Sequence, residues 1–216
     1  MNLAKGSKPW IYSAFIAGIV LLILFVFFID KYNGIIFLFL STIVFIKAIF
    51  LFQFFRDPER IIGEGIVACA DGRIREICNT KDEDVGNCTK ISTFMNIYNV
   101  HVNRIPLDGN IIDIVHKHGI HLPAFKKESE KNERVITTFD SNIGTLKVIQ
   151  IAGTIARRIV PYINKGDKLK KGDKIGIIRL GSRVDVYLPT KKIKNISVKV
   201  GDFVKAGETT IAEIND

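Results

Sequence analysis

Gly166-Asp-Lys-Leu-Lys-Lys-Gly-Asp173 and Gly201-Asp-Phe-Val-Lys-Ala-Gly-Glu208 share the frame Gly-Asp-x-Leu/Val-Lys-x-Gly-Asp/Glu and begin 35 positions apart. Glycine adopts positive φ angles without steric cost, and an aspartate can cap the backbone of its own turn. Each segment is therefore typical of a tight connection between two strands. The repetition of the frame predicts a β domain that contains internal quasi-repeats.

The chain around this pair also has a β pattern, with short segments rich in Ile and Val separated by Gly, Asp and Asn. We expect strands at 73–77, 111–115, 134–139, 145–151, 174–179, 184–188, 196–200 and 209–214, and one short helix at 154–162. The segment Ala70-Asp-Gly-Arg-Ile-Arg-Glu-Ile77 resembles the strand that precedes such turns in biotinyl and lipoyl carrier domains. The expected fold class is mostly β, a barrel-sandwich-like domain with biotinyl/lipoyl-like quasi-repeats.

The first 55 residues have a different composition and predict a transmembrane helical hairpin. Residues 10–29 carry no charge, and residues 34–55 are interrupted only by Lys47 and Gln53. About 20 apolar residues are enough for a helix to cross a bilayer core. A signal peptide would have a shorter apolar region and would not be followed at once by a second one. Two buried helices of a soluble protein are disfavoured because the remaining chain is too rich in β segments to surround them.

The charges that flank the hairpin predict its orientation. Lys5 and Lys8 precede the first apolar run, and Arg56 and Arg60 follow the second, whereas the connecting residues 30–33 hold one lysine and one aspartate. By the positive-inside rule, both ends of the hairpin lie in the cytoplasm. We therefore expect the chain at the cell membrane, with the domain that follows the hairpin on the cytoplasmic side.

The formal net charge is +9, and residues 151–216 contain 14 Lys or Arg against 7 Asp or Glu. A domain held against an anionic membrane surface explains this excess better than a nucleic-acid partner does. A solvated lysine-rich surface is the alternative.

Cys69, Cys78 and Cys88 form no C-x-x-C pair, so they indicate neither a zinc site nor a disulfide framework. We expect no metal site.

The segment with the most specific chemistry is Leu180-Gly-Ser-Arg-Val-Asp-Val-Tyr-Leu-Pro189. A Gly-Ser pair alone is an ordinary turn. Here it closely resembles the processing site of the phosphatidylserine decarboxylase proenzyme family, in its short form. Four other segments match that family in the same order: Phe54-Phe-Arg-Asp-Pro-Glu-Arg60, Ala70-Asp-Gly72, Asn96-Ile-Tyr-Asn-Val-His-Val-Asn-Arg-Ile-Pro106 and Asn132-Glu-Arg134.

The resemblance implies self-cleavage between Gly181 and Ser182. The serine hydroxyl attacks the carbonyl of Gly181, which has no side chain to shield it, and converts the peptide bond to an ester. Elimination and loss of ammonia then leave a pyruvoyl group at residue 182. The membrane anchor would be residues 1–55 and the catalytic domain residues 56–216. Cleavage would produce a heterodimer of chains 1–181 and 182–216.

The family's reaction is the decarboxylation of an anionic phospholipid with a serine headgroup. The resemblance implies that the pyruvoyl group from Ser182 forms a Schiff base with the substrate amine, accepts electrons as carbon dioxide leaves, and releases the ethanolamine lipid. It implies no metal, nicotinamide or pyridoxal phosphate. Phosphatidylserine and archaetidylserine both remain candidate substrates, because they share the serine and the phosphate.

By motif match, His101 and Asp71 are the catalytic acid–base residues. A histidine exchanges protons near neutral pH, and a buried aspartate can fix its tautomer. Longer members of the family have a second histidine at the position of Arg104, and an arginine cannot accept a proton. The base that activates Ser182 therefore stays open. His101 is the first candidate, and His116, His118, His121 and Asp71 are the alternatives.

The roles of the remaining matched residues are also open. Arg56 and Arg60 either bind lipid phosphate or anchor the hairpin by their charge. Asn132-Glu-Arg134 either contacts substrate or forms a turn before a strand. The alternative function is a non-catalytic, membrane-tethered adaptor or carrier of the biotinyl/lipoyl kind. A carrier would present a Met-Lys-Met-type turn, and the nearest candidate, Lys191-Lys-Ile-Lys194, has no methionine.

Overall fold

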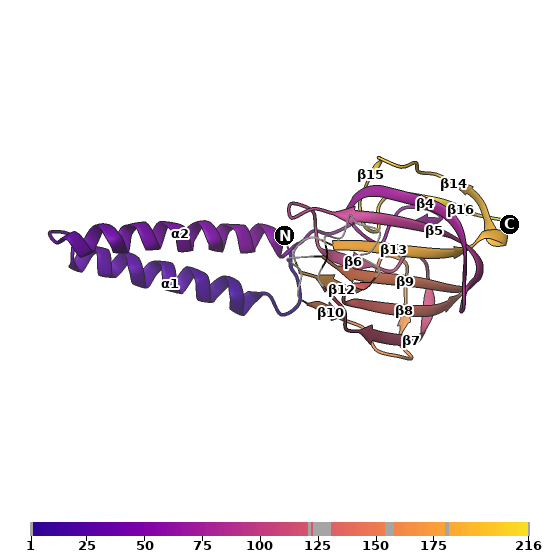
Figure 1. Ribbon diagram of the computed structural model, residues 1–216, viewed down its shortest axis with the longest axis horizontal. Coiled ribbons are helices and arrows are strands. Elements are labelled where there is room, and N and C mark those ends of the chain that lie inside the picture. The colour runs from indigo at the N-terminus through magenta and orange to yellow at the C-terminus, as the bar shows by residue number, and fades with distance from the viewer. Residues whose placement is uncertain (1, 121, 123–130, 154–157, 180–181, 216) are drawn as a thin grey trace. The chain divides into compact units, whose positions relative to one another are not determined.

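The structure is a computed structural model that describes residues 2–120, 122, 131–153, 158–179 and 182–215. It divides into two compact units, residues 1–58 and residues 59–216. The first unit is helical and the second consists mostly of β-strands (Figure 1).

Two antiparallel helices form the first unit. Helix α1 spans Lys8–Phe27 and α2 spans Tyr32–Phe54, so each begins two residues earlier than expected. Both helices are long and apolar enough to cross a membrane. A two-residue strand, β1 (Asn2–Leu3), pairs with β2 (Arg56–Asp57) and joins the two open ends of the hairpin.

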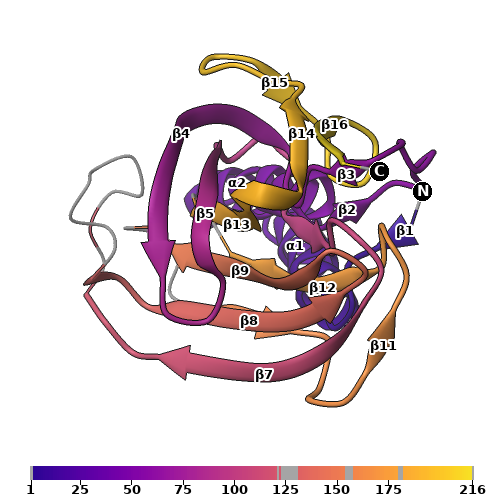
Figure 2. The same cartoon turned by 90° about the vertical axis from the view of Figure 1, so that its right-hand side faces the viewer.

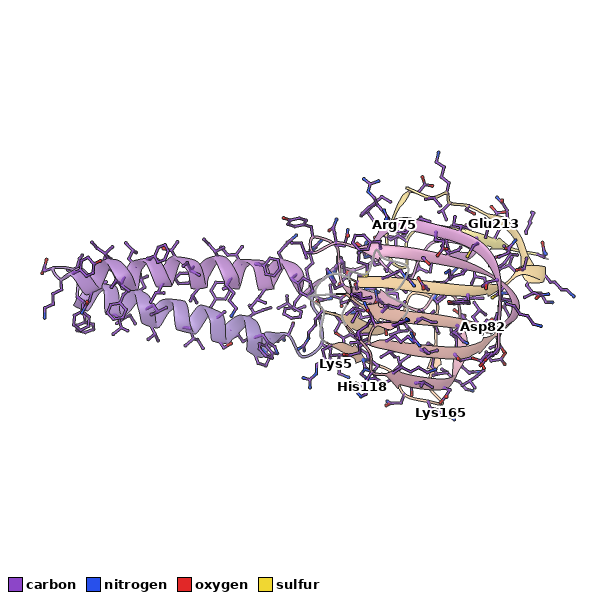
Figure 3. The ribbon with its side chains drawn as sticks, in the orientation of Figure 1. Lys5, Arg75, Asp82, His118, Lys165 and Glu213 are labelled. Atoms are coloured by element: carbon purple, nitrogen blue, oxygen red, sulfur yellow. The ribbon has the colours of Figure 1, made fainter. Side chains whose placement is uncertain are left out.

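The helices pack closely where small residues face each other. The hydroxyl of Ser41 donates a hydrogen bond to the carbonyl of Gly18 at 2.9 Å. A Cβ atom at Gly18 would lie 3.1 Å from the ring of Phe45, which itself packs against Phe15. Most of the large apolar side chains point away from the partner helix (Figure 3). This distribution is that of a hairpin whose outer surface faces an apolar surrounding.

The second unit contains an eight-stranded antiparallel sheet in the order β11-β7-β8-β9-β13-β5-β4-β15. Figure 2 shows that the sheet curls, so that β4 and β5 stand away from the plane of β7, β8 and β9. The strands are β4 (Gly72–Asp82), β5 (Gly86–Met95), β7 (Gly109–Lys117), β8 (Arg134–Ser141), β9 (Gly144–Ala152), β11 (Lys168–Leu169), β13 (Ser182–Pro189) and β15 (Phe203–Val204).

Two three-stranded sheets complete this unit, in the orders β10-β12-β6 and β14-β16-β3. Their strands are β3 (Ile66–Val67), β6 (Val102–Arg104), β10 (Ile159–Pro161), β12 (Lys174–Ile178), β14 (Ile193–Ile196) and β16 (Thr210–Ile214), and a 3₁₀ turn, η2 (Thr190–Lys192), precedes β14.

The strand orders are symmetric about the β9–β13 pair. On one side lie β8, β7 and β11, and on the other lie β5, β4 and β15. Strands β4 and β7 carry the same irregularity, a register shift between Ile74 and Glu76 and between Ile111 and Asp113. Each half of the large sheet has its own three-stranded sheet. The second unit is thus built from two similar halves.

The two Gly-Asp segments occupy equivalent places in these halves. Gly166 N–H donates to the carbonyl of Ile111, whose N–H donates to the carbonyl of Asp167, both at 2.9 Å. Gly201 and Asp202 make the same pair of bonds with Ile74, at 2.8 and 2.9 Å.

Both opening glycines of these segments have positive φ, 91° at Gly166 and 100° at Gly201. The repeated frame therefore encodes one turn, used at both edges of the sheet.

Three features of the strand pattern differ from the sequence-based expectation. The strand expected at 196–200 is wrong, because β14 ends at Ile196 and the chain continues without strand structure. The helix expected at 154–162 is wrong at 159–161, which form β10, while residues 154–157 lie outside the described residues. Strand β5 was not expected at all, and neither were the short strands β3, β6, β11 and β15. The other seven expected strands overlap observed ones.

The main core lies on one face of the eight-stranded sheet, between it and the two smaller sheets. Its largest fully buried side chains include Phe139, Ile74, Ile91, Leu146 and Ile175. Val184, Val186 and Leu188 of β13 point to this core, and by strand alternation Ser182 lies on the same face.

Replacing Phe139 by Ala should cost about 3–5 kcal/mol of unfolding free energy, because the ring is fully buried and leaves a cavity. For a domain of this size the midpoint of thermal unfolding should fall by roughly 6–20 °C. Circular dichroism of the detergent-solubilised protein measures this shift. Phe203→Ala is the control, since this ring is 51% exposed, and its midpoint should hardly move. Equal shifts in both variants would contradict the assigned core.

Candidate active site

The candidate site lies at one end of the eight-stranded sheet, where the central strand β13 begins. Ser182 is the first residue of β13 and pairs with Ala152 of β9 on one side and Met95 of β5 on the other. These three residues form one row across the sheet. Gly181 and Leu180 lie outside the described residues, so the expected scissile bond itself is not described.

The hydroxyl of Ser182 is fully buried and lies in a polar chain inside the core. It donates to Sδ of Met95 at 3.2 Å. The same sulfur accepts from the side-chain amide of Asn103 at 3.6 Å, and Gln150 Nε2 donates to Asn103 Oδ1 at 2.7 Å. A thioether is a weak acceptor and no base at neutral pH. The contact therefore orients the hydroxyl of Ser182 but does not remove its proton.

His101 is fully buried directly before β6. Its Nδ1 lies 2.8 Å from the carbonyl oxygen of Asn99. A carbonyl only accepts, so the neutral ring carries its proton on Nδ1 and Nε2 keeps a lone pair. The carbonyl of His101 accepts from the N–H of Ile178, the last residue of β12. This tautomer is the one that a base acting through Nε2 requires.

Asp71 directly precedes β4 and forms a buried ion pair with Arg60. The guanidinium donates to both carboxylate oxygens at 3.0 and 2.9 Å, and the N–H of Ala206 donates to one of them at 2.8 Å. Arg60 also binds Glu208 at 3.2 Å. Since its side chain is only 5% exposed, Arg60 is bound within this network and does not extend to solvent. The described bonds of Asp71 thus hold the segment before β4 to the turn before β16.

The other expected site residues are distributed as follows. Arg104 ends β6 and donates to the carbonyl of Gly172 at 2.8 Å. His116 lies near the end of β7, and His118 follows that strand. His121 lies outside the described residues. Arg56 lies in β2 and donates to the carbonyl of Gln53 at 2.7 Å.

Asn132, Glu133 and Arg134 lie at the same end of the sheet as Ser182. The amide of Asn132 donates to the carbonyl of Ala152, which pairs with Ser182, at 2.7 Å. Ala152 N–H in turn donates to the carbonyl of Glu133 at 2.9 Å. Asn132 and Glu133 are buried, so neither belongs to an exposed turn. Their hydrogen bonds to Ala152 hold the edge of the site in place.

A groove of about 330 Å³ lies on the opposite face of the sheet. Three of its charged side chains are in ion pairs: Lys147 binds Asp82 at 2.6 Å, and Asp185 binds Arg183 at 2.8 Å. Burial raises the pKa of the Asp185 carboxyl, and Arg183 opposes that rise. Because Asp185 and Ser182 alternate along β13, the groove and the serine hydroxyl are on different faces.

The sequence reasoning missed the polar chain of Met95, Asn103 and Gln150 and the partners of Asp71. The sequence did contain a signal for this polar chain. Gln150 interrupts a run of apolar residues, and the same-face neighbours of both Asn103 and Gln150 along their strands are buried. A polar side chain at such a position needs a buried partner. The cysteines behave as expected for unpaired thiols, and burial raises the pKa of Cys69.

Comparison with known proteins defines the class of this enzyme. The family model of phosphatidylserine decarboxylase matches residues 48–212. A phosphatidylserine decarboxylase proenzyme from Streptomyces avermitilis is 49% identical over 159 residues, covering 73% of this chain and 71% of the relative. One from Thermobifida fusca is 44% identical over 212 residues, covering 97% and 92%. A protein provisionally named archaetidylserine decarboxylase proenzyme, from Methanosarcina barkeri, is 41% identical over 216 residues, covering 98% of both chains.

The protein is therefore a carboxy-lyase. More particularly, the chain belongs to the phosphatidylserine decarboxylase family, as its motifs predicted. The adaptor or carrier alternative is not supported. The segment that was the nearest candidate for a carrier turn begins with Lys191 and Lys192, which lie in the 3₁₀ turn η2 between β13 and β14.

Removing either partner of the Arg60–Asp71 pair should leave the other charge buried. Asp71→Ala and Arg60→Ala should each cost about 3–5 kcal/mol of unfolding free energy, and the double variant should cost clearly less than the sum. Thermal unfolding of the three variants measures the coupling. Arg73→Ala is the control, because the bond of this arginine to the carbonyl of Gly201 is exposed. Strictly additive losses would show that the pair is not a unit.

Proposed function

We propose that this chain is a self-processing pyruvoyl enzyme that removes carbon dioxide from the serine headgroup of phosphatidylserine or archaetidylserine. The observation that carries the proposal is the place of Ser182, buried at the start of the central strand and next to the Gly181 that the family motif requires. The relatives' names support both lipid classes. Assays of the purified protein on each lipid in detergent decide between them.

The proposed self-processing uses residues of this chain alone. Ser182 Oγ attacks the carbonyl carbon of Gly181 as a base takes the hydroxyl proton, and the peptide nitrogen becomes a free amine on an ester-linked serine. Elimination across Cα and Cβ breaks the ester bond and releases residue 181 as a carboxylate. The remaining dehydroalanine takes up water and loses ammonia. The new pyruvoyl group supplies an electrophilic carbonyl that accepts the electrons left by carbon dioxide.

The surroundings of Ser182 fit such a group. The two cross-strand neighbours, Met95 and Ala152, carry no charge, and the small side chain of Ala152 leaves room beside residue 182. The side-chain amides of Asn103 and Gln150, which continue the polar chain from Met95, are able to donate hydrogen bonds. These residues would orient the group formed at 182 and keep water from it.

The proposed heterodimer would stay assembled after cleavage. Strand β13 keeps its ladders to β9 and β5, β15 keeps its pair with β4, and β16 keeps its pair with β3. Chain 182–216 would thus remain bound through hydrogen bonds on both sides of β13. The buried core face of β13 adds apolar contacts.

Histidine 101 is the proposed acid–base residue of the decarboxylation step. Its buried ring presents Nε2 as the basic nitrogen, and its segment is tied to Ile178 shortly before Ser182. The side-chain NH2 of Asn103, two positions along the chain, donates to the Met95 sulfur that also accepts from the Ser182 hydroxyl. Asp71 is proposed to support self-cleavage by fixing the start of β4 beside the row formed by Ser182, Ala152 and Met95.

The proposed location is the cell membrane, with the catalytic domain on the cytoplasmic side. Two apolar helices and the Lys and Arg residues that flank them support this topology. The substrate is itself an anionic lipid, and the basic last third of the chain favours such a surface.

We also propose that the paired halves of the β domain are related to biotinyl and lipoyl domains. The shared turn at Gly166 and Gly201 supports this relation.

Ser182→Ala should yield a single uncut chain without decarboxylase activity, because alanine has neither the nucleophile nor the oxygen that a pyruvoyl group needs. Intact mass and a lipid assay measure both effects. Ser141→Ala, at an exposed hairpin, is the matched control and should split normally. Normal splitting or turnover in Ser182→Ala would refute the whole mechanism.

His101→Ala should still split, yet decarboxylate roughly 10²–10⁴-fold more slowly, as loss of a positioned acid–base group typically costs. The reason is that self-cleavage needs a base at Ser182 before any substrate is bound, and His101 is assigned to the substrate carbon. Mass spectrometry and turnover on dispersed lipid separate the two steps. An uncut variant would show that His101 serves both steps, and a fully active one would make it a packed core residue only.

A further inference from the structure

A second group of reactive side chains lies at the end of the sheet, apart from the residues assigned to the reaction. His116 pairs with Val135 across β7 and β8, and Lys117 pairs with Arg134. Continuing this register by one pair places His118 opposite Glu133. Because side chains alternate along a strand, His118 lies on the same face as His116. The strand register thus gathers two imidazoles and one carboxylate.

The contacts show how closely these side chains approach. His116 Nε2 lies 2.9 Å from Glu133 Oε1. The rings of His116 and His118 stack with centroids 5.0 Å apart. One ligand atom from each of the three residues lies within 4.8 Å of the other two. A single ion can therefore reach all three with small side-chain rotations.

The carboxylate is held in place by its surroundings. Glu133 N–H donates to the carbonyl of Ile120 at 3.3 Å, and its carbonyl accepts from Ala152 at 2.9 Å. The adjacent Asn132 bonds the backbone of Leu122 through both its amide nitrogen and its oxygen. The Glu133 side chain is 11% exposed, whereas that of His116 is 39% exposed. A fixed carboxylate at the base and two accessible imidazoles form an open, three-ligand cluster.

We infer that His116, His118 and Glu133 bind a divalent transition-metal ion of the zinc class. Imidazole nitrogen favours zinc, copper, nickel and iron, while calcium and magnesium prefer sites made of oxygen. Two histidines and a carboxylate leave at least one coordination position open, as in mononuclear sites that bind a further ligand. The ion replaces the hydrogen bond between His116 and Glu133 and joins β7 to β8.

The site has a defined relation to Ser182. Glu133 is bonded to Ala152, and Ala152 pairs with Ser182, so Glu133 lies two strands from the serine. At a strand spacing of about 4.8 Å, the two backbones are roughly 10 Å apart. Figure 3 shows His118 at the end of the sheet away from Asp82, which lies at the tip of the β4–β5 hairpin. The ion would fasten the edge of the sheet beside the cleavage residue and lies too far away to touch its hydroxyl.

The test uses the full chain, purified without a histidine tag and stripped of metal with a chelator. Zinc binding is measured by calorimetry, and Co²⁺, which reports its ligands by absorption, serves as a second probe. We expect one equivalent of either ion and a higher midpoint of thermal unfolding when zinc is bound. Binding is read without substrate, so the outcome is independent of decarboxylase activity.

Variants identify the ligands. His118→Ala and Glu133→Gln should each weaken zinc binding by at least the roughly 10–100-fold that loss of an outer partner of a metal site costs. His118 is exposed, so its removal should leave the fold intact. Lys117→Ala, between the histidines but on the other face, is the matched control and should bind as the parent does. Equal binding in all variants, a sulfur-to-cobalt band from cysteine, or no binding by the parent would overturn the assignment.

Discussion

Pairing of β13 on both edges is the constraint on which the rest of the catalytic domain depends. Its ladder with β5 runs from Ser182 to Pro189, and that with β9 runs from Ser182 to Tyr187. A strand paired on both sides has its backbone groups satisfied and its direction fixed, so the first residue has little freedom. Ser182, the proposed nucleophile, is therefore placed by the main-chain hydrogen bonds of β13.

The buried polar groups around this strand then follow from the need to satisfy them. Asn103 and Gln150 bond each other inside the core, and Asp71 bonds Arg60 and the N–H of Ala206. Each would be costly if left alone in an apolar interior. Because their partners come from distant parts of the chain, these bonds also fix which strands meet. Stability and the arrangement of the site are therefore parts of the same hydrogen-bond network.

Sequence patterns were sufficient for the hairpin, for seven strands of the β domain and for the family, and insufficient for strand β5, the shortest strands and the partners of Asp71. The hairpin is a local property of composition. The Gly166 and Gly201 turns are local too, since positive φ and an aspartate cap act within a few residues. Strand β5 lacks apolar alternation because the buried Thr89 and Thr93 lie on the same face as Ile91 and Met95. Arg60 was assigned to the membrane hairpin because its partner Glu208 is distant in sequence. A local sequence pattern cannot reveal an ion pair between residues that lie so far apart in the chain.

The symmetry of the domain would allow the proposed cut next to the central strand to leave the fold intact. One half consists of β3, β4 and β5 together with β13, β14, β15 and β16, and the other half, β6 to β12, is inserted between them. The Gly181–Ser182 bond lies where the chain passes from the inserted half back to the first. Every strand remains whole on either side of that bond, so cleavage removes a connection between halves and no ladder pair. A cut within β13 or β9 would instead divide one of the two strands through which the halves pair, and the hydrogen bonds between these strands near Ser182 would be weakened.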